Sequence, residues 1–208
     1  MIQIPSTITP EYAVVPTGSR SSIVLARGDE ILKLTQRNPL GRLVADYETL
    51  LDRLSDFPDR VLPSWFGETV YGGEKYAVVA QRRFDGTTLV HHSSGSLNIF
   101  YQEVWENQRT GAENSRFVLA LIDWLLEATG SGCLYPDPVG CPENPILGHS
   151  QNLLVAKEDM RLVLCDVGLS PHADTAARDG AAFYDGNNVL RYRNCMQMVR
   201  GYIERCAT

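Results

Sequence analysis

Residues 151–168 read QNLLVAKEDMRLVLCDVG, two short apolar stretches on either side of the polar pair Glu158-Asp159. Apolar stretches around such a turn predict a β-hairpin. Because a hairpin returns the chain to the end from which it started, we expect Asn152 before it and Asp166 after it to lie close together. Amide oxygens and carboxylates are ligands of Mg²⁺ in proteins. The stretch therefore predicts a magnesium site.

This pattern resembles the metal-binding hairpin of protein kinases, in which an Asn opens a strand pair that closes in Asp-Phe-Gly. Here the closing residues are Asp166-Val167-Gly168. The resemblance implies that Asn152 and Asp166 hold Mg²⁺ against the phosphates of ATP. The alternative is an ordinary surface hairpin, since such short patterns also arise by chance.

A lysine interrupts an apolar strand nearer the start of the chain. Residues 13–35 predict two strands joined at Arg27-Gly28-Asp29, and Lys33 lies inside ILKLT of the second strand. A buried ammonium group is costly without a partner. In the kinase comparison, Lys33 contacts phosphate and pairs with Glu48 on a helix predicted over residues 40–54. The other interpretation is an edge strand with Lys33 facing solvent.

Two further segments occupy the places where kinases contact the nucleotide. Residues 17–22, TGSRSS, stand where a glycine-rich loop is expected, with Gly18 and Ser19 as phosphate donors, although the segment has one glycine. Residues 77–83, AVVAQRR, correspond to the strand and hinge that hold adenine through backbone hydrogen bonds, which assigns Gln81 and Arg82 to the nucleotide. Ordinary turns and strands often have similar sequences.

The resemblance to protein kinases implies a residue that accepts the substrate proton, and its usual position is not occupied by a base in this chain. Protein kinases carry an Asp five residues before the metal-binding Asn, where this chain has Leu147, and leucine cannot act as a base. The motif Leu134-Tyr135-Pro136-Asp137 follows a long apolar helix, as Tyr-Arg-Asp does in kinases. We interpret Asp137 as the catalytic aspartate, followed by a loop insertion of about ten residues. The alternatives are His149 as the base, or no base at all.

The order of the predicted elements favours an α+β fold, with strands first and helices afterwards. A strand pair is predicted at 64–70 and 74–82, and helices at 97–108, 115–129 and 188–206. Together with the resemblance, this order implies a single kinase-like domain with two lobes. They are a β-rich N-lobe over about residues 1–85 and a reduced, mainly helical C-lobe over about residues 86–208.

Composition restricts the partners of the chain. Its 208 residues carry a net charge of −6, which argues against nucleic acid as a partner. No apolar run approaches the roughly 20 residues that cross a bilayer, and the first residues lack the features of a signal peptide. The five cysteines form no C-x-x-C pair, so neither a disulfide framework nor a zinc site is indicated. We expect a soluble monomer that acts in a cytosol and does not bind membranes.

Taken together, the chain resembles a minimal protein kinase of the type delivered by bacterial secretion systems, and in size and layout it is similar to the HopBF family of type III effectors. The resemblance covers residues 16–168 and implies an ATP- and Mg²⁺-dependent Ser/Thr protein kinase. It further implies a kinase secreted from a bacterium that phosphorylates a host protein, the ninety-kilodalton heat-shock chaperone. The residues that carry it are Lys33, Glu48, Asp137, Asn152 and Asp166.

Two other classes of function remain open. A pseudokinase would bind nucleotide or a partner protein without transferring phosphate, and the single glycine of the loop and the displaced Asp137 favour this class. A small-molecule kinase related to aminoglycoside phosphotransferases would need a long helical C-lobe, whereas few residues follow Asp166.

Overall fold

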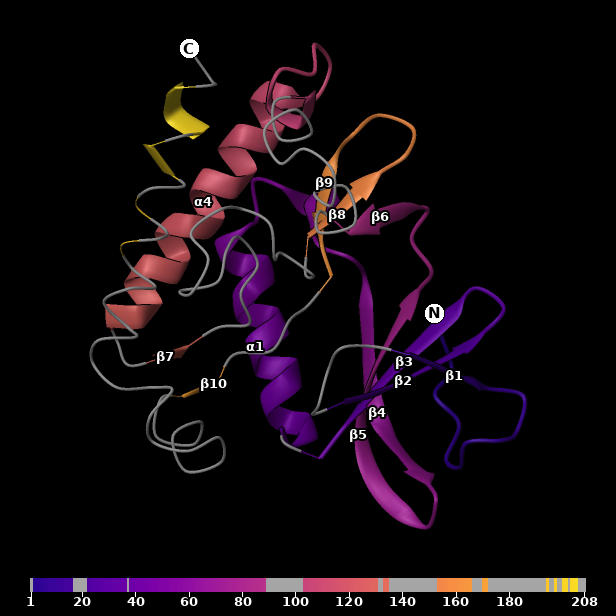
Figure 1. Cartoon of the computed structure of the whole chain (residues 1–208). Helices are drawn as coiled ribbons and strands as arrows, with labels where there is room; N and C mark the ends of the chain where they lie inside the picture. The colour runs from indigo at the N-terminus through magenta and orange to yellow at the C-terminus, as the bar shows by residue number, and fades with distance from the viewer. Residues whose placement is uncertain are drawn as a thin grey trace. The chain divides into compact units, whose positions relative to one another are not determined.

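The computed structural model describes residues 2–16, 22–36, 38–88, 103–130, 133–134, 153–165, 170–171, 194, 197, 200–201 and 203–205. The chain divides into two compact units. The first comprises Met1–Leu50 and Leu62–Phe84, and the second comprises Leu51–Val61 and Asp85–Thr208. The elements of each unit are labelled in Figure 1.

The first unit is built on a five-stranded antiparallel sheet with the order β1-β2-β3-β5-β4 (Figure 1). The turn between β2 and β3 contains Gly28, and the turn between β4 and β5 contains Gly72 and Gly73. All three glycines have positive φ, which a side chain would disfavour. Both predicted hairpins are confirmed. The strands are β1 Ala13–Val15, β2 Ser22–Arg27, β3 Glu30–Thr35, β4 Ser64–Tyr71 and β5 Glu74–Arg82.

The N-terminal segment, residues 2–12, covers one face of this sheet. It is tied to the edge strand β4 by hydrogen bonds from Ile8 N to Val70 O at 2.9 Å and from Val70 N to Ser6 O at 3.0 Å. This covering segment was not predicted from the sequence. The buried side chains of the cluster beneath it are Ile2, Tyr12, Leu25, Leu32, Leu34, Val78 and Ala80.

Helix α1, Leu40–Arg53, packs on the opposite face of the sheet. Leu43 and Leu50 are buried on one side of the helix. On the same side the ring of Tyr47 lies 5.1 Å from the ring of Phe66, and its hydroxyl accepts a hydrogen bond from Ser64 N at 3.2 Å. Because neighbouring residues of a strand point to opposite faces, Phe66 lies on the face that the N-terminal segment leaves open.

The second unit combines helix α4, Gly111–Gly130, with two small sheets. The ring of Phe57 meets the ring of Phe117 of α4 edge-on at 5.6 Å, which attaches the short 3-10 helix η1, Pro58–Arg60, to α4. One sheet has the order β6-β8-β9, and the other is the pair β7 and β10. Their strands are β6 Gly86–Thr88, β7 Cys133–Leu134, β8 Leu153–Ala156, β9 Leu162–Leu164 and β10 Ser170–Pro171.

Helix α4 begins at Gly111 instead of the predicted Ser115. Asn107 Oδ1 accepts hydrogen bonds from the main-chain N–H groups two and three residues later, at 3.0 and 3.1 Å, and so organises the turn before the helix. A Cβ atom on Gly111 would lie 2.1 Å from Trp105 O, so this tight start requires glycine. Of the helix predicted over 97–108, residues 103–105 are helical, 106–108 are not, and 97–102 lie outside the described residues.

The described residues of the predicted C-terminal helix are helical, at 194, 197, 200–201 and 203–205. Ile203 is fully buried, as expected for its apolar side, and Arg200 forms an ion pair with Asp123 of α4. Within the ranges given above, no helix is long and apolar enough to cross a membrane.

Candidate functional site

Lys33 lies in the middle of a row of residues that crosses all five strands of the first sheet. Paired residues of antiparallel strands share a face, so Lys33 lies on the face against which α1 packs. Its side chain is half-buried between apolar neighbours. Since β3 is a central strand, the interpretation of Lys33 as an edge-strand residue is wrong. The row reads Val15, Val24, Lys33, Val79 and Phe66.

The predicted phosphate loop connects β1 to β2. Val15 and Val24 are paired and belong to the row of Lys33. The predicted loop therefore leads into β2, which is paired with β3, the strand that carries Lys33. Gly18 and Ser19 themselves lie outside the described residues.

The acidic residue on the buried side of α1 is Asp46, whereas Glu48 is exposed. Asp46 follows Leu43 by three positions and precedes Leu50 by four, and this spacing places the three residues on one side of a helix. An oxygen of Asp46 lies 3.6 Å from Arg42 Nε. The pairing of Lys33 with Glu48 stays a prediction. The helical spacing was visible in the sequence and could have indicated Asp46.

Gln81 and Arg82 end strand β5, and both are paired with β3. Gln81 Nε2 donates to Ser64 Oγ at 2.9 Å on the sheet face that carries Lys33. Arg82 forms an exposed ion pair with Asp29 at 2.5 Å, and Arg83 N donates to Asp29 O at 2.6 Å. Asp29 of the β2–β3 turn therefore binds both the Arg82 side chain and the Arg83 N–H group. The predicted contacts of Gln81 and Arg82 with adenine stay predictions.

Strands β8 and β9 form the hairpin that the sequence predicted. Leu153 pairs with Leu164, and Val155 pairs with Leu162. These four side chains are buried. The paired residues Leu153 and Leu164 form one end of the hairpin. Asn152 directly precedes Leu153 in the sequence, and Asp166 follows Leu164 by two residues. Asn152 and Asp166 lie outside the described residues, among which no cluster of three or more His, Cys, Asp or Glu side chains could hold a metal ion.

A second strand pair joins the segments that carry the candidate base and a candidate metal ligand. Leu134 of β7 pairs with Ser170 of β10 in an antiparallel register. Asp137 follows Leu134 by three residues, and Asp166 precedes Ser170 by four. Both segments start from the same end of this pair. Asp137 and the alternative base His149 lie outside the described residues.

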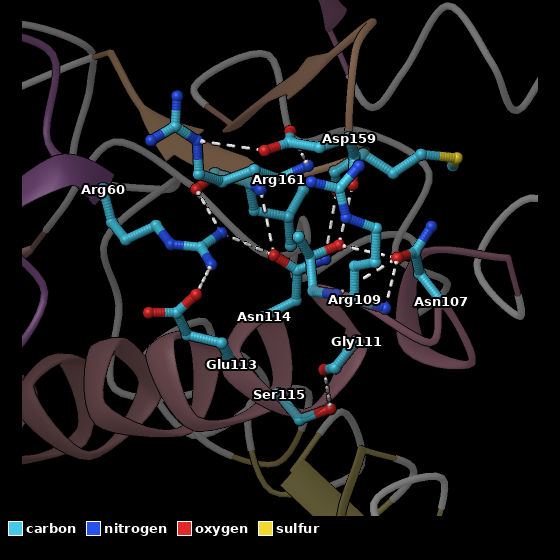
Figure 2. Close-up of polar contacts among 12 residues, drawn as sticks. Arg60, Asn107, Arg109, Gly111, Glu113, Asn114, Ser115, Asp159 and Arg161 are labelled. Atoms are coloured by element: carbon cyan, nitrogen blue, oxygen red, sulfur yellow. Dashed lines mark hydrogen bonds and ion pairs between the residues drawn. The ribbon is translucent and has the colours of Figure 1, made fainter.

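Sequence reasoning missed a buried polar network in the second unit, shown in Figure 2. Arg60 is 2% exposed, and its Nη1 donates to Asn114 Oδ1 at 2.6 Å and to Leu162 O at 3.3 Å. Its Nη2 pairs with the carboxylate of Glu113. Asn114 is fully buried, and its Nδ2 donates to Met160 O at 3.0 Å. An Arg two residues after a proline gives no sequence signal of burial.

The N-terminal segment ends at Tyr12, whose pKa is raised from its ordinary value. Burial raises the pKa of Tyr12, and a hydrogen bond from its hydroxyl to Glu30 at 3.1 Å acts in the same direction. The guanidinium of Arg27 lies 4.6 Å from the centre of the Tyr12 ring and opposes this shift. The contacts of Tyr12 with Glu30 and Arg27 hold the N-terminal segment against the first sheet. We propose no catalytic role for Tyr12.

No family model and no curated protein matches the sequence. Among solved structures, the chain is similar to the kinase domain of PknI from M. tuberculosis, with 16% sequence identity and a TM-score of 0.33 over 79% of the chain. The chain spans 61% of the length of that kinase domain. A likeness of this size determines neither the fold nor the activity of this chain.

Proposed function

We propose that this chain is a Ser/Thr protein kinase that uses ATP and Mg²⁺. The observation that carries the proposal is the position of Lys33, half-buried on a central strand between Val24 and Val79. A cation in apolar surroundings needs anionic partners to offset its desolvation. A phosphate group and a helix carboxylate supply such partners.

The proposed reaction transfers the terminal phosphoryl group of ATP to a substrate hydroxyl. Lys33 binds the phosphates, and Asp137 accepts the hydroxyl proton as the oxygen forms its bond to phosphorus. The bond between the terminal phosphorus and its bridging oxygen breaks, and ADP leaves. Asn152 and Asp166 are the residues that would hold Mg²⁺, which offsets phosphate charge when bound. The β8–β9 and β7–β10 pairs support this assignment because the segments to Asn152, Asp166 and Asp137 start from them.

Two carboxylates of α1 are candidate partners of Lys33. Burial on the same side of α1 as Leu43 and Leu50 favours Asp46, whereas the resemblance of the sequence to protein kinases favours Glu48. A carboxylate that faces the sheet can reach a lysine on that face more directly than one on the exposed side of the helix. We therefore propose Asp46 as the partner, with Glu48 as the rival that mutagenesis can test.

The finer assignment rests on the family resemblance. We propose an effector of the HopBF type that is secreted from a bacterium, acts as a monomer in the cytosol of a host cell and phosphorylates the ninety-kilodalton chaperone. The net charge of −6 is consistent with a protein substrate and disfavours nucleic acid.

A pseudokinase is the second candidate. Leu147 stands where kinases carry their catalytic Asp, and the TGSRSS segment has one glycine. If Asp137 does not act as the base, the chain would bind nucleotide or a partner without phosphoryl transfer.

The test is transfer of labelled phosphate from ATP in the presence of Mg²⁺, with a eukaryotic lysate and with the purified chaperone. We expect label on Ser or Thr for the wild type and none for Asp166→Ala. Glu158→Ala is the matched control, because this exposed acid lies in the turn at the other end of the same hairpin. Nucleotide-dependent thermal stabilisation without transfer would support the pseudokinase, and label on small molecules alone would support a small-molecule phosphotransferase.

A further inference from the structure

The outer edge of strand β9 is bound by side chains. Arg161 O accepts a hydrogen bond from Ala156 N at 2.9 Å, so the main-chain groups of Arg161 point toward β8. Those of the next residue, Leu162, therefore point away from β8. Leu162 N donates to Asn114 Oδ1 at 3.0 Å, and Leu162 O accepts from Arg60 Nη1 at 3.3 Å. Two side chains thus make the hydrogen bonds that a further strand would make.

The main chain continues this edge contact toward the end of β9. Val61, which follows Arg60, forms a parallel bridge with Leu164. Residues two apart in a strand present their main-chain groups to the same edge. Leu162 and Leu164 are therefore both held on the side away from β8. The sequence-predicted metal ligand Asp166 comes two residues later.

The network uses the full hydrogen-bonding capacity of the Asn114 amide. Its Oδ1 accepts from Arg60 and Leu162, and its Nδ2 donates to Val104 O and Met160 O, each at 3.0 Å. An amide group has two donors and two acceptor sites, so none is left over. A saturated buried network rigidifies the groups that it joins, whereas a partly satisfied one is costly. The start of α4 therefore fixes the start of β9 (Figure 2).

The turn of the hairpin is bound to the same region of α4. Thr110 Oγ1, just before the helix, donates to Asp159 O at 2.8 Å. Asp159 Oδ1 accepts in turn from Arg161 N at 3.0 Å. The hairpin is thus held at its turn by Thr110 and along β9 by Arg60 and Asn114.

We infer that Arg60 and Asn114 are positioning residues for the Mg²⁺ site, because they fix the strand that leads to Asp166. This inference rests on the proposed kinase function. Neither residue is assigned a contact with ATP or metal. Residues that orient metal ligands without binding the metal commonly change metal affinity by about 10-fold or more when they are replaced.

The variant that tests the inference is Arg60→Lys. It keeps a cation at the buried position but lacks the planar fork that reaches Asn114, Leu162 and Glu113 together. Arg53→Lys is the matched control, since Arg53 forms an exposed ion pair with Glu127 at 3.0 Å in the same unit. Glu113→Gln is a milder second variant, which removes only the charge that holds Nη2 of Arg60.

Two measurements on the 208-residue chain test the inference. The first is hydrogen exchange of the β9 amides, compared with those of β5. The second is the Mg²⁺ concentration that gives half-maximal binding of a non-hydrolysable ATP analogue. For Arg60→Lys we expect faster exchange in β9 alone and a half-saturating Mg²⁺ concentration raised by about 10-fold. Glu113→Gln should shift both in the same direction by less, and Arg53→Lys should change neither.

The other outcomes contradict the strand-holding role of the network, its effect on the Mg²⁺ site or the proposed function. Unchanged β9 exchange in Arg60→Lys and Glu113→Gln would show that the network does not hold the strand. Faster exchange with an unchanged Mg²⁺ response would reduce the network to a structural role. If Arg60→Lys does not fold, Glu113→Gln decides by the same two criteria. Absence of Mg²⁺-dependent nucleotide binding in the wild type would overturn the proposed function and with it the inference, whatever the exchange result.

Discussion

Leu134 of β7 and Ser170 of β10 are paired in an antiparallel register, although they are far apart in the sequence. The pairing brings together the chain segment that precedes Asp137 and the segment that follows Asp166. The proposed phosphoryl-transfer site requires its base and its metal ligand to lie near each other, and a pairing of these two segments is consistent with Asp137 as the proposed base. Catalytic roles for both residues can be tested separately.

Asp137→Asn should abolish phosphoryl transfer and leave nucleotide binding intact. An amide of the same shape cannot accept the substrate proton, and loss of general-base catalysis typically costs about 10²–10⁴-fold in rate. The measurement is kcat for transfer together with the affinity for ATP. His149→Ala is the parallel variant and should retain activity. Full activity of Asp137→Asn with loss in His149→Ala would reverse the assignment.

Lys33→Met should remove ATP binding without unfolding the first unit. Methionine keeps the apolar stem between Val24 and Val79 but lacks the ammonium group that, under the proposed function, binds phosphate. The readout is thermal stabilisation by ATP and Mg²⁺, which is lost when the nucleotide no longer binds the folded protein. Lys75→Met is the control, because Lys75 is an exposed lysine of the same sheet. ATP stabilisation that persists in Lys33→Met would contradict the phosphate role.

Asp46→Asn should reduce phosphoryl transfer more than Glu48→Gln. Asp46 lies on the buried side of α1 and Glu48 on its exposed side, so removal of the charge at position 46 affects the buried carboxylate of the helix. Both substitutions preserve side-chain shape. The measurement is kcat/KM for ATP in the two variants. A larger loss in Glu48→Gln would support the pairing of Lys33 with Glu48 that the sequence resemblance to protein kinases predicted.

Asn114→Leu should destabilise the second unit strongly. Leucine leaves Val104 O, Met160 O and Leu162 N without the side-chain partner that binds them, and each unsatisfied buried group costs about 1–3 kcal/mol. The measurement is the free energy of unfolding in urea. Asn194→Leu, at an exposed helical position, is the control and should have little effect. Equal stability of the two variants would contradict the structural weight given to the network.

Above about pH 10, the free energy of unfolding should fall more steeply for the wild type than for Tyr12→Phe. The folded-state pKa of Tyr12 is raised, so the folded protein holds this proton more tightly than the unfolded chain does. The stability contributed is fully present below the unfolded pKa of 10.0 and is lost as pH rises through the folded pKa. Parallel curves for the two proteins would show that Tyr12 does not titrate in this way.

Local patterns predicted the elements whose sequences carry strong periodicity or turn residues. The glycine turns of the first sheet, helix α1 and the β8–β9 hairpin each have such a signal, and each was found. Helix α4 was placed correctly except for its start, which depends on the contact between Gly111 and Trp105 O. That contact joins residues whose relation no periodicity reveals.

The features that were missed depend on contacts between segments distant in the sequence. The N-terminal segment gains its structure from the edge of β4, and the two-residue strands β7 and β10 are defined only by each other. Arg60 appears from sequence to be an ordinary surface charge, yet its burial depends on Asn114 and Leu162. For the candidate site, the lysine strand and the hairpin were predictable, whereas the burial of Asp46 required the packing of α1.

The most direct test of kinase activity is phosphate transfer by the purified wild type, with Mg²⁺ and after its removal by a chelator, beside Asp166→Ala. The label is followed from the terminal phosphate of ATP to Ser or Thr of the purified chaperone. We predict transfer only by the wild type with Mg²⁺. No transfer by folded wild-type protein to the chaperone or to any lysate protein, or equal transfer by Asp166→Ala, would contradict the assignment of this chain as a magnesium-dependent protein kinase.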